Sequence, residues 1–80
     1  MTRIEMNWGR WYLNINAMDL RYDVNPSHTY EIPLETCCSE ERRARWIEHI
    51  VEKSWATDRD IVNLRMAFDW LLERGYFDKD

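Results

Sequence analysis

The chain has 80 residues and a formal net charge of −4, with 45% hydrophobic and 32% charged residues. This length predicts one domain over residues 1–80, and the apolar fraction excludes a disordered chain. The acidic balance argues against direct binding to nucleic acid and favours a basic protein partner. No segment has the length and hydrophobicity of a membrane span, and two adjacent cysteines give no reason to expect an oxidising compartment. We therefore expect a cytoplasmic protein without membrane contact.

Hydrophobic and polar residues alternate along residues 10–17, 20–24 and 30–34, which read RWYLNINA, LRYDV and YEIPL. Such alternation is typical of strands with one buried face, so residues 10–35 are predicted to form a three-stranded antiparallel meander. Pro33 predicts that the last strand lies at a sheet edge or ends early, because proline cannot donate a ladder hydrogen bond. The face turned away from the core is then polar, and it carries Tyr12, Asn14, Asn16, Arg21, Asp23, Glu31 and Glu35.

The first nine residues, MTRIEMNWG, also alternate, but the parity changes at Gly9 and Arg10. A bulge, a turn or a loose extension would each explain this change. Residues 1–9 are therefore either an extra strand or a loose extension of the chain.

The hydrophobic period then becomes helical, which predicts helices over residues 39–54 and 58–74. Thr57 and Asp60 fit a capping box at the start of the second helix, and Gly75 fits the left-handed residue that follows a helix end. Strands followed by two helices predict an α+β fold with both helices packed on one face of the sheet. The residues of the second helix that we expect to face the core are Ile61, Leu64, Phe68, Leu71 and Leu72.

The junction LETCCSEERRARW, residues 34–46, could be a metal site, a basic patch or the start of a helix. Cys37 and Cys38 are adjacent and lack the spacing of zinc ligands, so we expect one thiol to be buried as a small apolar group. Helical geometry places Arg43 at the edge of the core. The other basic residues form a row on the outer face beside an acidic row, where opposite charges are expected to compensate. These rows are Arg42, Arg45, His49 and Lys53, beside Glu41, Glu48 and Glu52.

The sequence contains no known catalytic motif: it lacks a Gly-rich phosphate loop, a serine elbow and a paired-histidine helix motif. His28 lies in an expected turn and His49 on an exposed helix face, and neither has a local partner for general base catalysis. We therefore expect a protein that is not an enzyme and that has no cofactor and no metal site.

The second predicted helix has more hydrophobic surface than one core contact needs. Val62, Met66 and Trp70 follow one another at four-residue spacing, on a different side from the core stripe. Aromatic and Met side chains within a charged rim are typical of protein interfaces, so we predict a docking face with Trp70 and Met66 as its anchors. The rim consists of Arg59, Asp69 and Glu73. The alternative is that this second stripe is also core, covered by residues 1–9 or by the C-terminal GYFDKD.

The segments WYLNI, YEIPLETC and RWIEHIVEKSWATDRDIVNLRMAFDWLL resemble a type of short, single-domain bacterial protein without an assigned activity, over residues 10–72. In size and charge the chain is also similar to mobile-element inhibitors, anti-CRISPR proteins among them, and to immunity proteins. The missing catalytic motifs, the acidic balance and the second stripe of the second helix predict a non-enzymatic binding protein that occupies a surface of a larger protein or nucleoprotein complex. The similarity in size and charge suggests that this protein is an inhibitor of a bacterial CRISPR-type defence complex. The alternative is a homodimeric accessory, immunity or antitoxin-type protein that uses the same helix face.

Overall fold

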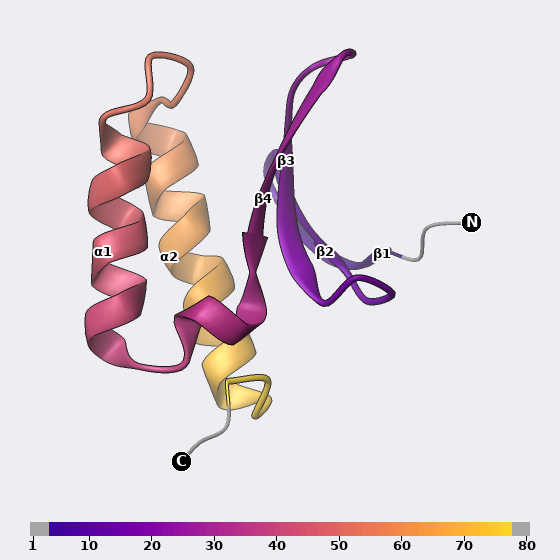
Figure 1. Cartoon of the computed structure of the whole chain (residues 1–80), viewed down its shortest axis with the longest axis vertical. Helices are drawn as coiled ribbons and strands as arrows, with labels where there is room; N and C mark the ends of the chain where they lie inside the picture. Colours follow the sequence, from indigo (N-terminus) through magenta and orange to yellow (C-terminus); the bar gives the residue numbers. More distant parts are fainter. Residues whose placement is uncertain (1–3, 78–80) are drawn as a thin grey trace.

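The chain folds as an antiparallel sheet followed by two helices, which confirms the α+β class. The computed structural model describes residues 4–77. The strands β1 (Ile4–Trp8), β2 (Trp11–Asn14), β3 (Asp19–Asn25) and β4 (His28–Pro33) lie side by side in sequence order. A short 3-10 helix, η1 (Leu34–Cys37), leads to α1 (Glu40–Val51) and α2 (Asp58–Glu73). Both α-helices lie on the same side of the sheet (Figure 1).

The sheet has four strands, so the prediction of a three-stranded meander was wrong in its count. Gly9 and Arg10 form a two-residue turn that places Trp8 opposite Trp11 in the β1–β2 ladder. Gly9 has a φ of +61°, which suits the first central position of such a hairpin. The two-residue turn accounts for the change of parity at Gly9–Arg10, because residues opposite each other in a ladder point to the same face.

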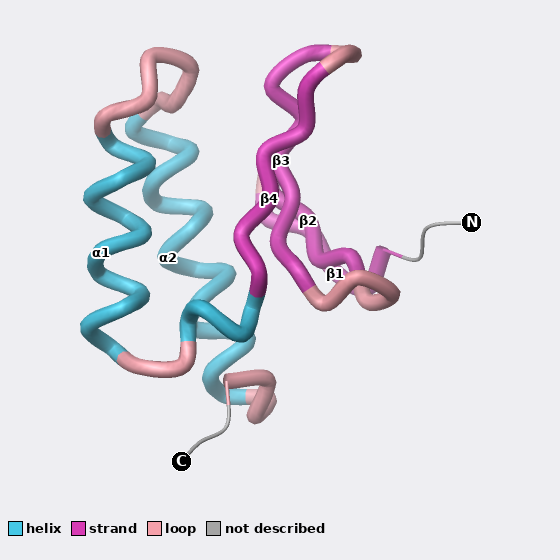
Figure 2. The backbone as a smooth tube through the Cα atoms, in the orientation of Figure 1, coloured by secondary structure: helices cyan, strands magenta, loops and turns pink. Residues whose placement is uncertain are grey.

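The second strand ends three residues earlier than the alternation of residues 10–17 suggests. The side-chain oxygen of Asn14 accepts hydrogen bonds from the backbone N–H groups of Asn16, at 3.0 Å, and Ala17, at 3.1 Å. These bonds turn the chain, and Met18 follows with a positive φ of 55°. Asn16 therefore lies in a loop and not on the outer sheet face. Figure 2 shows this connection as a loop between β2 and β3.

The last strand, β4, lies at a sheet edge, as Pro33 predicted. The chain then leaves the sheet as η1, so Leu34 and Glu35 do not extend β4. Leu34 is nevertheless buried at 3% exposure, whereas Glu35 is exposed away from the sheet. The prediction that Glu35 belongs to the outer sheet face was wrong.

Local hydrogen bonds fix the helix ends. The Ser39 hydroxyl accepts from the backbone N–H of Arg42 and caps α1, which ends at Val51, three residues before the predicted end. The capping box of Thr57 and Asp60 is present at the start of α2. After α2 the chain closes a Schellman motif: Gly75 has a φ of +81°, and its N–H and that of Tyr76 donate to Leu72 and Leu71.

The core lies between the sheet and the two helices. The buried hydrophobic residues are Trp8, Trp11, Leu13, Leu20, Tyr22, Ile32, Leu34, Cys37, Ile50, Leu64, Ala67, Phe68, Leu71 and Phe77. Leu72 was expected to face the core but is 51% exposed, because it lies one residue, about 100° of helix turn, beyond the buried Leu71. In the part of the chain that the structure describes, no helix has both the length and the hydrophobicity to span a bilayer.

Candidate functional site

The outer face of α2 carries most of the predicted docking residues. The core face of this helix is occupied by Leu64, Ala67, Phe68 and Leu71, which are buried. Facing away from them is a stripe spaced by three and four residues, all of it exposed. We call it the outer stripe of α2, and it consists of Arg59, Val62, Met66, Asp69 and Glu73. Its two hydrophobic members are 55% exposed at Val62 and 53% exposed at Met66.

Trp70, the predicted anchor, is partly buried and packs against the core. Its ring meets Trp8 edge-on at a centroid distance of 5.5 Å and stacks on Tyr76 at 6.0 Å. The guanidinium of Arg74 lies 4.5 Å from the centre of the same ring. The N-terminal segment and the C-terminal tail therefore both cover Trp70, so the alternative of a covered stripe holds for this residue and not for Val62 or Met66.

Asp69 lies on the opposite side of the stripe from Trp70. It lines a groove of about 390 Å³ between the two helices, together with Ala44 and Ile47 of α1 and Arg65 of α2. The centre of the outer stripe is therefore Val62 and Met66, with Asp69 towards α1 and Trp70 towards β1. Of the two predicted anchors, Met66 is exposed and Trp70 is partly buried.

The basic face of α1 forms a second surface feature, an open pocket of about 330 Å³. We call it the α1 pocket, and it is lined by Thr36, Arg42, Arg45, Trp46 and His49. The sequence pattern placed Arg42, Arg45 and His49 correctly on an exposed face but did not predict the pocket. Of the expected charge pairs, the structure contains the one between Arg45 and Glu41, at 3.1 Å.

The cysteines and Arg43 occupy the junction as the sequence predicted. Cys37 is buried and Cys38 exposed, and burial raises the pKa of the Cys37 thiol to about 11. The Arg43 guanidinium lies 5.1 Å from the centre of the Phe77 ring and donates to the carbonyl oxygen of Cys37 at 2.8 Å. Among residues 4–77, no three His, Cys, Asp or Glu side chains are grouped so that they could hold a metal ion.

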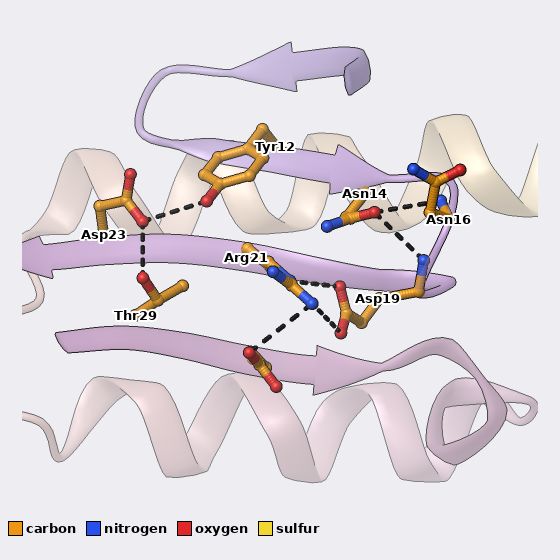
Figure 3. A network of polar contacts seen from close by, with 9 residues as sticks. Tyr12, Asn14, Asn16, Asp19, Arg21, Asp23 and Thr29 are labelled. Atoms are coloured by element: carbon orange, nitrogen blue, oxygen red, sulfur yellow. Dashed lines mark hydrogen bonds and ion pairs between the residues drawn. The ribbon is translucent and has the colours of Figure 1, made fainter. Parts of the chain in front are cut away.

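The outer face of the sheet is polar, and its side chains bind one another (Figure 3). Asp23 accepts hydrogen bonds from the hydroxyls of Tyr12 and Thr29, each at 3.0 Å. Burial, and then the bond to Asp23, raise the pKa of Tyr12. Arg21 donates to Asp19 at 2.9 Å. These groups therefore satisfy one another's hydrogen-bonding capacity within the sheet.

Comparison with known protein families, with curated proteins and with solved structures found no match. Two surfaces of the chain are candidates for binding. The outer stripe of α2 offers apolar side chains in a charged rim, which suits contact with a protein. The α1 pocket offers positive charge beside an indole ring, which suits an anionic ligand.

Proposed function

We propose that this is a non-enzymatic binding protein that acts by occupying a surface of a larger protein partner through the outer stripe of α2. The observation that carries this proposal is the exposure of Val62 and Met66 on a helix whose core face is already filled. Because about half of each side chain is already covered, burying the rest against a partner would contribute about 1 kcal/mol for each. Met surrounded by charged residues is common at the centre of interfaces, because its flexible side chain adapts to the opposing surface.

The chemistry of the chain favours a basic partner. The net charge of −4 attracts a basic surface, and the rim residues Asp69 and Glu73 can pair with Lys or Arg across the interface. A bacterial CRISPR-type defence complex is the first partner to test, because the chain is similar in size and charge to mobile-element inhibitors. Association with a basic partner will weaken as the salt concentration rises.

The test compares wild type with the double variant Val62→Gln, Met66→Gln. Glutamine favours helix and leaves the core face of α2 unchanged, so the variant should fold. The control is Val51→Gln, because Val51 is 59% exposed but lies on α1, outside the stripe. Wild type, the control and the double variant are each used to capture proteins from a host lysate. A protein that wild type and the control retain but the double variant does not is purified, and its affinity for each of the three is measured by titration. We expect the double variant to bind it at least about tenfold more weakly. Equal affinity of the folded double variant and wild type for the purified protein would refute the docking face.

A homodimer is the second candidate, and the order of charges along the stripe favours it. Arg59, Val62, Met66 and Asp69 read positive, apolar, apolar, negative. In an antiparallel pair of α2 helices, Val62 of one copy meets Met66 of the other at the three-four spacing of a helix seam. The same register places Arg59 opposite Asp69 of the second copy at both ends of the contact. The stripe is thus complementary to itself about a two-fold axis.

Charge exchange tests the dimer. Arg59→Asp places carboxylates opposite each other at both ends of the contact, and Asp69→Arg does the same with guanidinium groups, so each variant should dissociate the dimer. The double variant Arg59→Asp, Asp69→Arg restores opposite charges and should dimerise again. Light scattering and sedimentation across a dilution series provide the measurement. A wild-type protein that is monomeric at every concentration rules out the dimer, and so does a double variant that stays dissociated while wild type dimerises.

A further inference from the structure

Trp46 forms a fixed wall of the α1 pocket. Its indole N–H donates to the Thr36 hydroxyl oxygen at 2.9 Å, and that hydroxyl donates to the carbonyl oxygen of Pro33 at 2.6 Å. The ring also lies edge-on to Tyr30, with centroids 6.4 Å apart, and to His49 at 5.8 Å. Contacts within the protein therefore set the orientation of the indole, and the pocket is formed before any ligand enters.

The cationic side of the pocket is only partly neutralised. Arg42, Arg45 and His49 follow one another at three-residue and four-residue spacing, so they share one face of α1. Glu41 pairs with Arg45, but both side chains are about three-quarters exposed, and such exposed pairs are weak. Within residues 4–77 the guanidinium of Arg42 has no hydrogen-bond or ion-pair partner. The pocket therefore has positive charge available, although the whole chain is acidic.

These features together define the chemistry of a ligand. A guanidinium binds an oxyanion through paired N–H groups, and one guanidinium is enough for a carboxylate. Two of them, Arg42 and Arg45, suit a phosphate group, which has more acceptor oxygens and more negative charge. The indole of Trp46 offers an apolar surface to a planar ring. A volume of about 330 Å³ is at the lower end of the range for small-molecule sites, roughly 300–1,000 Å³.

We propose that the α1 pocket binds a small ligand of the mononucleotide class, with its phosphate on Arg42 and Arg45 and its base against Trp46. This site is separate from the outer stripe of α2 and does not depend on it. The Thr36 hydroxyl donates its one hydrogen to Pro33 and accepts from Trp46, so it has no hydrogen left to donate to a base. The site therefore selects for a phosphate and a planar ring and only weakly for the identity of the base.

The test is to titrate the full chain separately with adenosine monophosphate, adenosine and inorganic phosphate. Binding is measured by calorimetry and by the shift of the NMR signal of the Trp46 indole N–H. Because the chain has five Trp residues, Trp46→Phe is used to assign that signal. We expect the nucleotide to bind with a dissociation constant below about 1 mM and to move the Trp46 signal. Adenosine and inorganic phosphate should each bind at least about tenfold more weakly, because each lacks one of the two contacts.

Arg42→Gln and Arg45→Gln should each weaken nucleotide binding by about fivefold or more, because each removes a charged hydrogen bond. Arg65→Gln is the matched control, since Arg65 is an exposed arginine on α2 that lies outside the pocket and outside the outer stripe. Equal losses in all three variants would show nonspecific attraction by charge and overturn the proposal. Equal binding of the nucleotide and inorganic phosphate would overturn base recognition, and the absence of binding at millimolar nucleotide would overturn the site.

Discussion

Asp60 shows how one residue can serve both a helix end and the core. Its side-chain oxygen Oδ2 accepts from the backbone N–H of Thr57 at 3.0 Å and from the Tyr22 hydroxyl at 2.7 Å. Its carbonyl oxygen accepts from the Trp11 indole N–H at 3.1 Å. The bond to Thr57 spans three residues and was predictable from the sequence. The bonds to Tyr22 and Trp11 were not, because they join positions 38 and 49 residues apart.

Replacing Asp60 should therefore cost more than replacing an ordinary helix-start aspartate. Asp60→Ala removes half of the capping box and leaves the buried Tyr22 hydroxyl without an acceptor, so we expect a loss of about 3 kcal/mol in unfolding free energy. Asp58→Ala is the control, because Asp58 is exposed in the same helical turn and should cost about 0.5 kcal/mol. Urea denaturation measures both. Similar losses at the two positions would contradict a structural role of the Asp60–Tyr22 bond.

The raised pKa of Tyr22 should make the folded state less stable at high pH. Burial, and then the hydrogen bond to Asp60, raise this pKa from 10.0 to about 12. Because the pKa of Tyr22 is higher in the folded state than in the unfolded state, the neutral Tyr22 hydroxyl stabilises the fold. This contribution is complete below about pH 10 and is lost as the pH rises towards about 12. We expect the urea midpoint of wild type to fall between about pH 9 and about pH 11.5, and to fall less in Tyr22→Phe, which cannot ionise there. Parallel declines in both proteins would disprove this assignment.

At the scale of elements, the sequence predicted those boundaries that local contacts determine. Both ends of α2 depend on bonds between residues at most five positions apart, and the prediction placed them within one residue. α1 ends early because Glu52 and Lys53 donate to carbonyls three residues back, which tightens the last turn. The sequence does not decide whether residues 1–9 form a strand, because nothing in MTRIEMNWG shows that this segment pairs with β2. That pairing depends on the turn at Gly9.

Gly9 is the element-scale position where a substitution should have the clearest effect. Its φ of +61° disfavours other residues, and an added Cβ would collide with the side chain of Asn63 on α2. We expect Gly9→Ala to cost about 1–2 kcal/mol, because the end of the Asn63 side chain has to shift in addition to the backbone strain. Gly75→Ala, with a positive φ but no atom within 4 Å, should cost about 1 kcal/mol.

A double-mutant cycle separates strain from collision at Gly9. In an Asn63→Ala background the collision is absent, so Gly9→Ala should cost only the backbone strain, about 1 kcal/mol. Urea denaturation of the four proteins provides the measurement. An unchanged cost in the Asn63→Ala background would mean that the Asn63 side chain turns away from the added Cβ at no measurable cost.

At the scale of the whole molecule, the sequence predicted a second stripe on α2 but not which of its side chains are exposed. The spacing of Val62, Met66 and Trp70 follows from local helix geometry alone. Whether each side chain is free depends on chain segments far away in the sequence, and a single-helix pattern cannot show this. Trp8 and Tyr76 cover Trp70, while no described residue covers Val62 and Met66 enough to bury them.

Trp70 should therefore behave as a structural residue and Met66 as a surface residue. Trp70→Ala removes the contacts with Trp8 and Tyr76, so we expect a loss of about 3 kcal/mol in unfolding free energy. Met66→Ala should change stability by less than about 0.5 kcal/mol, because Met66 is half exposed and alanine favours helix.

The pair Trp8 and Trp70 joins the first strand to the last helix, and its coupling measures how strongly the N-terminal hairpin is held. Combining Trp8→Ala with Trp70→Ala should cost less than the sum of the single losses by about 1 kcal/mol, the energy of one edge-on aromatic contact. Chemical denaturation of the two single variants and the double variant gives this coupling. Strict additivity, together with a negligible effect of Trp70→Ala alone, would mean that Trp70 is free in solution. In that case the docking face would extend from Val62 to Trp70, as the sequence alone suggested.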